Sequence, residues 1–394
     1  MNKLKQIDKE LLLVLFLILG PILDVSSYYK LPFNIVVRSI YLLILIILLL
    51  KNKENIKLLI IILVFSILQL LFQVFYLNFS IVNSISNVLK FLYLPVSILY
   101  FSNFEFKRFN RNKILTIIIF LYIVIYTFSY ITGIGSNVYI KKVGKRGFKG
   151  VFTSINEFSA ILAGLLPIVS VYLKNNKKNI LLILLFIGVL FCSLLIGTKV
   201  LLGGIILTIL YLLYLDRNKL FIERTKLQKV LIILLAVVTL IMTIFIVSKT
   251  RTYQNMLVQQ KFFKVKNVLS YDFLNYVVFN NRLTFLNMNF NLYSKTNILG
   301  YLLGIGINTY QVKMVEIDLF DILFRYGIIG LIIFLYPLIK INYKKLTSEE
   351  KLALIIFILI SLTSGHVLFY PSVCIYIGLI LSESGDKKND ETKR

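Results

Sequence analysis

The chain has 394 residues, 58% of them hydrophobic, and a mean hydropathy of +0.84. No soluble domain of this length is so apolar along its whole length, so the composition indicates a polytopic membrane protein. The net charge of +26 would suit a nucleic-acid-binding protein. The lysines and arginines, however, form short clusters between apolar runs and do not line one soluble face, which excludes that class.

Apolar runs long enough to cross a bilayer, about 17 residues each, recur along the whole chain. They cover residues 11–28, 33–50, 58–77, 84–101, 114–132, 152–173, 180–197, 200–215, 229–247, 319–338, 352–366 and 367–383. The pairs 180–215 and 352–383 also fit one long kinked run each. The sequence therefore predicts an all-α polytopic membrane protein of about twelve transmembrane helices, with residues 1–394 forming a single integral membrane domain.

Short basic segments between the runs fall on one side of the membrane when the N-terminus is placed in the cytoplasm. They are KNKENIK, FKRFNRNK, KNNKK, DRNKLFIERTK and INYKKLTSEEK, and the N-terminal lysines and the tail DKKNDETKR join them. Because short cytoplasmic loops are enriched in lysine and arginine, the sequence predicts a multi-pass protein of the cytoplasmic (inner or plasma) membrane with both termini cytoplasmic. A basic loop at 134–150 and one large loop at 248–318 then lie outside.

The loop at 134–150 departs from the same rule. It carries Lys141, Lys142, Lys145, Arg146 and Lys149 and no acid, whereas short outer loops are normally poor in such residues. Either these side chains are only solvated, or they attract an anion to the outer face.

Charged and polar residues inside the predicted helices gather near the outer face. Glu316, Asp318 and Asp321 begin the helix at 319–338, and Arg325 follows about six residues in, some 9 Å deep. A similar depth is shared by Arg38, Lys90, Asn156, Glu157, Lys199 and His366. Because charged groups in a membrane avoid lipid and line cavities, we infer one polar cavity that opens outward.

The excess charge around this predicted cavity is cationic, which favours an anionic ligand. Clustered arginine and lysine suit a phosphate or pyrophosphate, and we assign to such a site Arg38, Lys90, Arg146, Lys199 and Arg325. Glu316, Asp318 and Glu157 are candidate general bases. No cofactor or metal is expected, because the chain lacks a Cys/His cluster and GKRGFKG lacks the P-loop spacing. A divalent metal held by EIDLFD is the alternative.

Each of these residues also has a simpler structural explanation. Acids at a helix start interact favourably with the helix dipole by about 0.3–1 kcal/mol, and Asp321 and Arg325 fit an i, i+4 pair. Arg38 and Lys90 could extend toward the interface, and His366 fits an interfacial polar position. The shared depth of the whole set favours a common site.

Several motifs resemble the superfamily of O-antigen polymerases and O-antigen ligases, which are bacterial envelope enzymes. NNRLTFLNMNFNLYSKTNILGYLLGIGINTY, followed by VEIDLFDILFRYGIIGLIIFL, is similar to a family pattern of an opening arginine, a glycine-rich turn and a helix with Gly-x-x-Gly. In this chain those residues are Arg282, Gly304, Gly306, Gly327 and Gly330.

Two upstream matches extend the resemblance to about residues 145–335. GFKGVFTSINEFSAIL resembles the family's Gly-Phe-x-x-x-Asn entry to a helix, and IGTKVLLGG places Lys199 where the family commonly has an arginine. Lysine keeps the charge but loses the bidentate fork, so the family role does not transfer unchanged to Lys199.

The resemblance implies a GT-C-like helix bundle and a glycosyltransferase that acts on undecaprenyl-pyrophosphate-linked oligosaccharides outside the cytoplasmic membrane. It implies a polysaccharide polymerase of the cell envelope, as in capsule synthesis, that transfers the growing chain onto the next lipid-linked repeat unit. Glu316, Asp318 and Arg282 are then the expected catalytic residues. A chain-length regulator protein is a candidate partner besides the lipid bilayer.

Two other functions stay open at this point. A ligase would transfer the same lipid-linked chain to a different acceptor. A flippase or transporter for lipid-linked oligosaccharide belongs to another class, and it should carry cations through the full depth of its pathway. The inner halves of the predicted helices are nearly free of charge, which speaks against that class.

Overall fold

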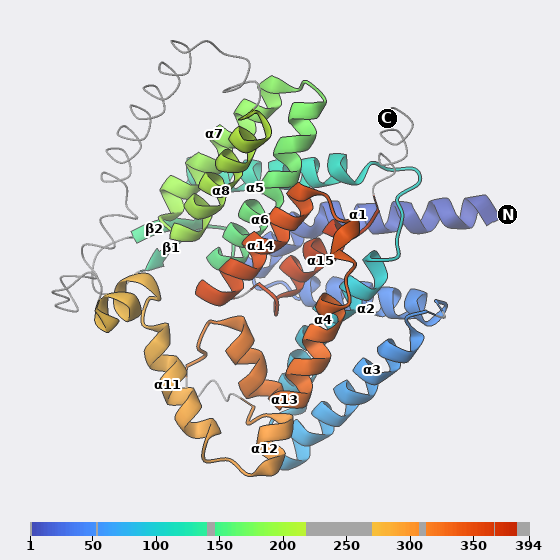
Figure 1. The fold of residues 1–394 in the computed structure, drawn as a ribbon, viewed down its shortest axis with the longest axis vertical. Helices are drawn as coiled ribbons and strands as arrows, with labels where there is room; N and C mark the ends of the chain where they lie inside the picture. The colour runs from blue at the N-terminus through green and yellow to red at the C-terminus, as the bar shows by residue number, and fades with distance from the viewer. Residues whose placement is uncertain are drawn as a thin grey trace.

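The computed structural model describes residues 2–52, 54–139, 146–217, 270–306, 313–365 and 367–383, and these are mainly helical (Figure 1). The N-terminal half contains α1 (Asn2–Tyr28), α2 (Phe33–Leu50), α3 (Ile56–Leu71), α4 (Ile81–Phe101), α5 (Arg111–Thr132), α6 (Ile155–Asn175), α7 (Asn179–Ile196) and α8 (Lys199–Leu215). The C-terminal part contains α11 (Arg282–Tyr293), α12 (Ile298–Leu303), α13 (Asp318–Ile339), α14 (Ser348–Thr363) and α15 (Pro371–Ile380).

Smaller elements join or extend these helices. Two π-helical turns cover Phe72–Tyr76 and Phe273–Val278, and a 3-10 turn covers Tyr343–Lys345. The basic loop is a short antiparallel hairpin of β1 (Ser136–Tyr139) and β2 (Arg146–Gly150). The described part of the large loop is helical, since it contains α11 and α12.

The expected fold class, an all-α polytopic membrane protein, is confirmed. Within the described ranges, eight helices are long and apolar enough to cross a membrane, and α8 and α15 are shorter apolar helices. The uncertain pairs are separate helices: Gly197, in the left-handed conformation with φ 73°, ends α7, and residues 364–370 separate α14 from α15. The expected helix at 229–247 lies outside the described residues, so the total of about twelve stays a prediction.

Two helices organise the core. α4 packs against α15, α3, α2 and α13, and α6 packs against α14, α8, α5 and α7. Small residues allow these close contacts, as is common between membrane helices. A Cβ on Gly378 of α15 would lie 2.8 Å from the Cβ of Ser97 on α4, and one on Gly204 of α8 would lie 2.5 Å from the Cβ of Ala163 on α6.

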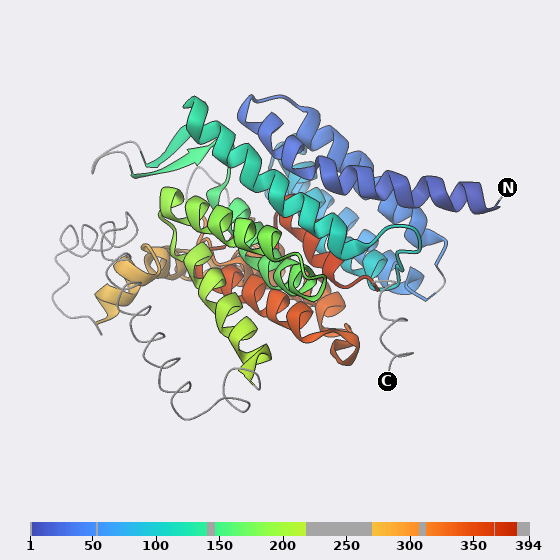
Figure 2. The same ribbon diagram turned by 90° about the horizontal axis from the view of Figure 1, so that it is seen from above.

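The bundle has two polar ends, which we call the Arg325 end and the Arg111 end. The Arg325 end collects the last turns of α1 and α14 and the first turns of α2, α6, α8 and α13. The Arg111 end collects the first turns of α5 and α14 and residues 380–383. Figure 2 shows the β1–β2 hairpin on the opposite side of the molecule from the N-terminus of α1.

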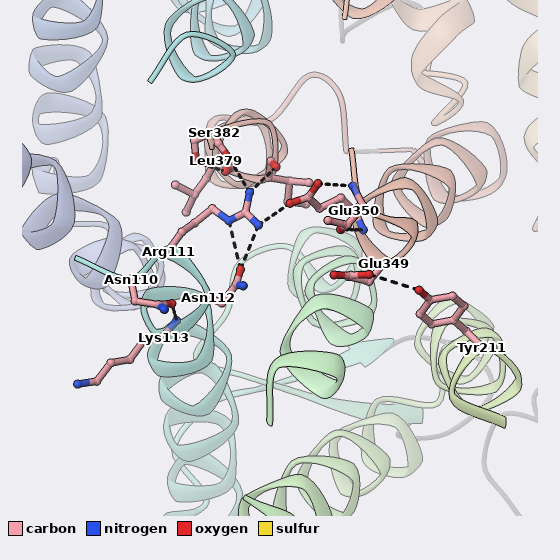
Figure 3. A network of polar contacts seen from close by, with 11 residues as sticks. Asn110, Arg111, Asn112, Lys113, Tyr211, Glu349, Glu350, Leu379 and Ser382 are labelled. Atoms are coloured by element: carbon pink, nitrogen blue, oxygen red, sulfur yellow. Dashed lines mark hydrogen bonds and ion pairs between the residues drawn. The ribbon is translucent and has the colours of Figure 1, made fainter. Parts of the chain in front are cut away.

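The Arg111 end contains a buried ion pair that the sequence analysis placed among loop charges. Arg111 donates to Oε1 of Glu350 at 2.5 Å, to the Asn112 side chain at 3.1 Å and to the carbonyl oxygen of Ile380 at 2.9 Å (Figure 3). Arg111 is 2% exposed and Glu350 is 1% exposed. The sequence analysis did not anticipate that these two loop charges are buried, and they neutralise each other.

Candidate active site at the Arg325 end

The connection between α14 and α15, of which residues 364, 365 and 367–370 are described, lies at the centre of the candidate site. Both helices reach the Arg111 end, where Glu350 of α14 and Ile380 of α15 contact Arg111. α15 has 10 residues, a length of about 15 Å, or roughly half of the hydrocarbon core. The connection therefore enters the bundle as non-helical backbone, which membrane proteins tolerate only inside protein or beside water.

Polar side chains from α6 and α11 hold the start of this connection. Nδ2 of Asn156 donates to the carbonyl oxygen of Ser364 at 2.9 Å. Arg282 donates to the same oxygen at 3.2 Å and to the carbonyl oxygen of Thr363 at 3.1 Å. Such bonds satisfy carbonyls that the end of α14 leaves without helical partners. The structure thus brings Asn156 and Arg282, which are far apart in the sequence, to one backbone segment.

Arg282 also forms an ion pair with Glu316. The distance from Arg282 to Oε2 of Glu316 is 2.9 Å, and Lys313 lies 3.5 Å from Oε1. The Glu316 side chain is 22% exposed, and its backbone has φ 62°, a left-handed conformation that is uncommon for a residue with a side chain. Gly365 allows the chain to pass here, since a Cβ on it would lie 2.5 Å from the Glu316 backbone. Lys199 interacts electrostatically with Arg282.

Asp318 has a structural position that does not suit the expected role of a general base. It is 2% exposed, and its Oδ2 accepts the N–H groups of Val367 and Leu368 at 2.8 Å each. These bonds fix the α14–α15 connection to the first residue of α13. The geometry therefore favours Glu316 over Asp318 as the base.

Asp321 does not form the expected i, i+4 ion pair with Arg325. Its two carboxylate oxygens accept the N–H groups of Val315 and Glu316 at 3.0 Å each. These bonds order the segment that leads into α13, and Asp321 contributes only a longer-range attraction to Arg325. Among the described residues no three His, Cys, Asp or Glu side chains gather as a metal site requires, so the EIDLFD acids serve separate partners.

Arg325 is buried among neutral groups. Its guanidinium donates to Sδ of Met314 at 2.8 Å and to Oδ1 of Asn87 at 3.4 Å, and it lies 5.0 Å from the centre of the Phe369 ring. Arg325 is 6% exposed, and its Nε finds no partner among the described residues. A guanidinium normally takes carboxylates when it is buried, so this one retains capacity for a further anion.

Lys90 is a second cation beside Arg325. Its Nζ lies 5.7 Å from the centre of the Tyr370 ring, and its charge interacts with those of Arg325 and Glu157. Within the described ranges, no carboxylate lies within ion-pair distance of Lys90 or Arg325. The two neighbouring cations therefore form the strongest candidate anion site.

Arg38 is a less available cation. It pairs with Asp24 at the end of α1 at 2.7 Å, and the hydroxyl of Tyr122 donates to the second oxygen of Asp24 at 2.5 Å. Glu157 lies within electrostatic range of this group and accepts the hydroxyl of Ser372 at 2.5 Å. Arg38 thus belongs to the same end of the bundle, but Asp24 already neutralises it.

A break in α13 explains the glycine motifs beside Arg325. Gly327 interrupts the helix with φ 69° and ψ −172°. The carbonyl of Phe324, freed by the break, accepts the N–H of Ile305 at 2.9 Å. Gly304 makes this approach possible, because a Cβ there would lie 2.3 Å from the carbonyl oxygen of Arg325. Broken membrane helices of this kind recur at binding sites.

Two assigned residues cannot be placed. His366 lies outside the described residues, and of Arg146 only the backbone in β2 is described. Lys149, which lies in β2 with Arg146, is half-buried. This burial lowers the pKa of its ammonium group, and the charge of Glu157 raises it. The hairpin therefore comes close enough to Glu157 for one of its cations to join the electrostatics of the site.

Sequence reasoning missed several residues of this end. Asp24 and Asn87 lie within apolar runs that were treated as plain membrane spans. Tyr370 ends the α14–α15 connection, and Ser372 follows it. An aspartate inside a predicted helix is itself a signal. The segment SGHVLFYPS, between two short apolar runs, carries the glycine and proline typical of a helix interruption.

Comparison with known proteins supports a family assignment. The family model described as O-antigen ligase like membrane protein matches residues 6–268 and 258–383. No curated protein and no solved structure matches the chain. The family match covers nearly the whole sequence, including both the helices of the core and the residues of the candidate site. The chain therefore belongs to the family of O-antigen ligase-like membrane proteins, which process glycans.

Proposed function

We propose that the protein is a glycosyltransferase that polymerises polysaccharide from undecaprenyl-pyrophosphate-linked oligosaccharides at the outer face of the cytoplasmic membrane. It transfers a growing glycan chain from its lipid carrier to a lipid-linked repeat unit. The Arg325 end then faces outward, and both termini lie in the cytoplasm. The family match supports the broad reaction class, and the polar residues of the Arg325 end support the donor chemistry.

The pair of Lys90 and Arg325 carries this proposal. The two cations interact with each other, and within the described residues neither forms an ion pair. Glu157 and Asp321 attract them only over longer distances, and their direct neighbours are aromatic or neutral polar groups. Holding two such charges close together inside a bundle is unfavourable unless an anion joins them. A pyrophosphate group, with its several oxygens, suits neighbouring arginine and lysine.

The proposed reaction is a direct displacement at the anomeric carbon. The hydroxyl of the acceptor sugar attacks this carbon and loses its proton to Glu316, while the bond from the carbon to the pyrophosphate oxygen breaks. The undecaprenyl pyrophosphate leaves as an anion, and Lys90 and Arg325 stabilise its developing charge. The bond between the sugar and the pyrophosphate already supplies the driving force, so no nucleotide is required outside the cell.

Arg282 supports the base in this scheme and does not bind the donor directly. Its two terminal NH2 groups donate to Glu316 and to the carbonyl oxygens of Phe279, Thr363 and Ser364. It therefore orients the Glu316 carboxylate and ties it to the α14–α15 connection. Glu157 is the second candidate base, since it lies within electrostatic range of Lys90.

A ligase is the second candidate function, because the matching family is described as ligase-like. A ligase would use the same donor site and differ only in its acceptor. The experiment uses purified protein in lipid nanodiscs with a lipid-linked repeat unit as the sole substrate. Chains of several repeats should form in this reaction. A parallel reaction adds a non-lipid-linked acceptor, and transfer only to that acceptor would indicate a ligase instead.

Variants then test the anion site within the same assay. Arg325→Ala should lower the rate of chain formation by roughly 10²-fold or more, as expected for loss of one charge-stabilising group. Arg325→Lys should also be poor, since lysine lacks the bidentate fork. Full activity in Arg325→Ala protein that is folded and inserted would remove the proposed site.

A further inference from the structure

A chain of three amide side chains, two of them buried and one half-buried, connects Arg325 to the break in α13. We call Gln69, Gln73 and Asn87 the amide chain. Nδ2 of Asn87 donates to Oε1 of Gln73 at 3.2 Å, and Nε2 of Gln73 donates to Oε1 of Gln69 at 3.4 Å. The guanidinium of Arg325 donates to Oδ1 of Asn87 at 3.4 Å. Gln69 and Gln73 are each 1% exposed.

The far end of the amide chain is fixed by backbone carbonyls. Nε2 of Gln69 donates to the carbonyl oxygen of Leu303 at 2.8 Å and to that of Tyr326 at 3.5 Å. Leu303 ends α12, and Tyr326 is the residue before Gly327, where α13 breaks. Gln69 therefore joins the two backbone segments whose approach defines the position of Arg325.

The two ends force every amide in the chain to point the same way. Backbone carbonyls only accept, so Gln69 must present its nitrogen to them, and arginine only donates, so Asn87 must present its oxygen to Arg325. Each intermediate amide then donates in one direction and accepts in the other. Hydrogen bonds aligned in this way polarise one another, which strengthens the acceptor that faces the guanidinium.

The amide chain orients the Arg325 guanidinium without neutralising its charge. An aspartate or glutamate beside Arg325 would hold the guanidinium equally well but would cancel its charge, as Asp24 does for Arg38. Neutral amides hold it and leave the charge available. Buried amides are unfavourable in an apolar helix unless they are hydrogen-bonded. Gln69 in α3 and Gln73 in the π-helical turn that follows it would therefore be poor choices if packing were their only role.

We propose that Gln69, Gln73 and Asn87 are positioning residues that aim the Arg325 guanidinium at an anionic ligand and preserve its positive charge. The inference rests on the proposed function in one respect, since it takes the diphosphate of a lipid-linked donor as that ligand. It adds a dependence of donor binding on residues of α3, of the π-helical turn Phe72–Tyr76 and of α4 that do not touch the donor.

The test measures binding of inorganic pyrophosphate to the purified full-length protein by titration calorimetry. Gln73→Met keeps the length of the side chain but interrupts the amide chain, and it should weaken pyrophosphate binding about tenfold, comparable to one hydrogen bond to a charged group. Combined with Arg325→Ala, it should cause no further loss. Ser66→Ala is the matched control, because this buried hydroxyl of α3 bonds only to the carbonyl of Ile62 on its own helix, and its binding should equal that of wild type.

Asn87→Asp provides a second variant that does not depend on the behaviour of Gln73→Met. It keeps an oxygen toward Arg325 but adds a negative charge, so pyrophosphate binding should weaken even where the protein is fully folded. Equal losses from Gln73→Met in the wild-type and Arg325→Ala backgrounds would overturn the proposal, as would wild-type affinity in Asn87→Asp. Wild-type protein that binds pyrophosphate but forms no polymer would remove the polymerase function and leave the positioning role intact.

Discussion

The two ends of the bundle each bury an arginine, and they treat it in opposite ways. Arg111 meets the carboxylate of Glu350 and several oxygen acceptors, so its charge and its donors are satisfied. Arg325 meets a thioether, an amide and an aromatic ring. A paired arginine joins helices together, whereas an arginine held by neutral groups is prepared for an anion from outside the chain.

The surroundings of the two arginines follow the same division. Glu350 also accepts the N–H of Thr347 in a capping box at the start of α14, so the ion pair at the Arg111 end fixes a helix terminus. At the Arg325 end, Lys90 adds a second cation to the first. The comparison indicates that burial of a charge is not by itself a sign of function. The chemical identity of its partner distinguishes a structural ion pair from a site prepared for a ligand.

The largest effect is expected from Arg111→Ala, which leaves the Glu350 carboxylate buried without its cation. Breaking such a pair lowers the free energy of unfolding by about 3–5 kcal/mol, and thermal unfolding in detergent should show it. The double replacement Arg111→Met with Glu350→Leu should recover most of this loss. Lys345→Ala is the control, because its pair with Glu383 is exposed and contributes about 1 kcal/mol or less. Loss of polymer in stable double-variant protein would mean that the Arg111 end also acts in the reaction.

A smaller and more selective effect is expected from the acids of the Arg325 end. Glu316→Gln should lower the rate of chain formation by roughly 10²-fold, as for removal of a general base, with pyrophosphate binding unchanged. Its loss of thermal stability should be small, because the amide oxygen of glutamine still accepts from Arg282. Asp318→Ala should instead lower stability, by about 1–3 kcal/mol for each buried N–H left unpaired. The two variants would exchange these phenotypes if Asp318 were the base.

The smallest perturbation is a cysteine label that reports which end faces outward. Cysteines at Asn137 in β1 and at Ser270 should react with an impermeant thiol reagent in intact cells, and one at Asn176, which follows α6, should not. The native Cys192 and Cys374 are buried, so their background is low. Such surface substitutions should change stability by about 0.5 kcal/mol or less. Labelling at Asn176 alone would place the Arg325 end in the cytoplasm and contradict the proposed topology.

Much of the helix arrangement was predictable because a lipid environment restricts the chain to a few solutions. Apolar runs of spanning length must form helices that satisfy their own backbone, and the described helices follow those runs closely. The sequence analysis also placed Glu316, Asn156 and Glu157 at a common depth, and the structure brings them to one end together with Arg282. The pairing of these residues was not predictable, because several side chains at equal depth allow many combinations.

By itself, the sequence determined the class of protein, the spans of most helices and the end of the bundle at which polar residues collect, because hydropathy and helix rise act locally along the chain. Only the tertiary structure decided which charges are neutralised. Asp318 and Asp321 bind backbone N–H groups of distant or preceding segments, Glu316 pairs with Arg282, and Arg325 is left with Asn87. These outcomes depend on the break at Gly327 and on the buried α14–α15 connection. Such contacts join residues as far as 238 positions apart, and hydropathy contains no information about them.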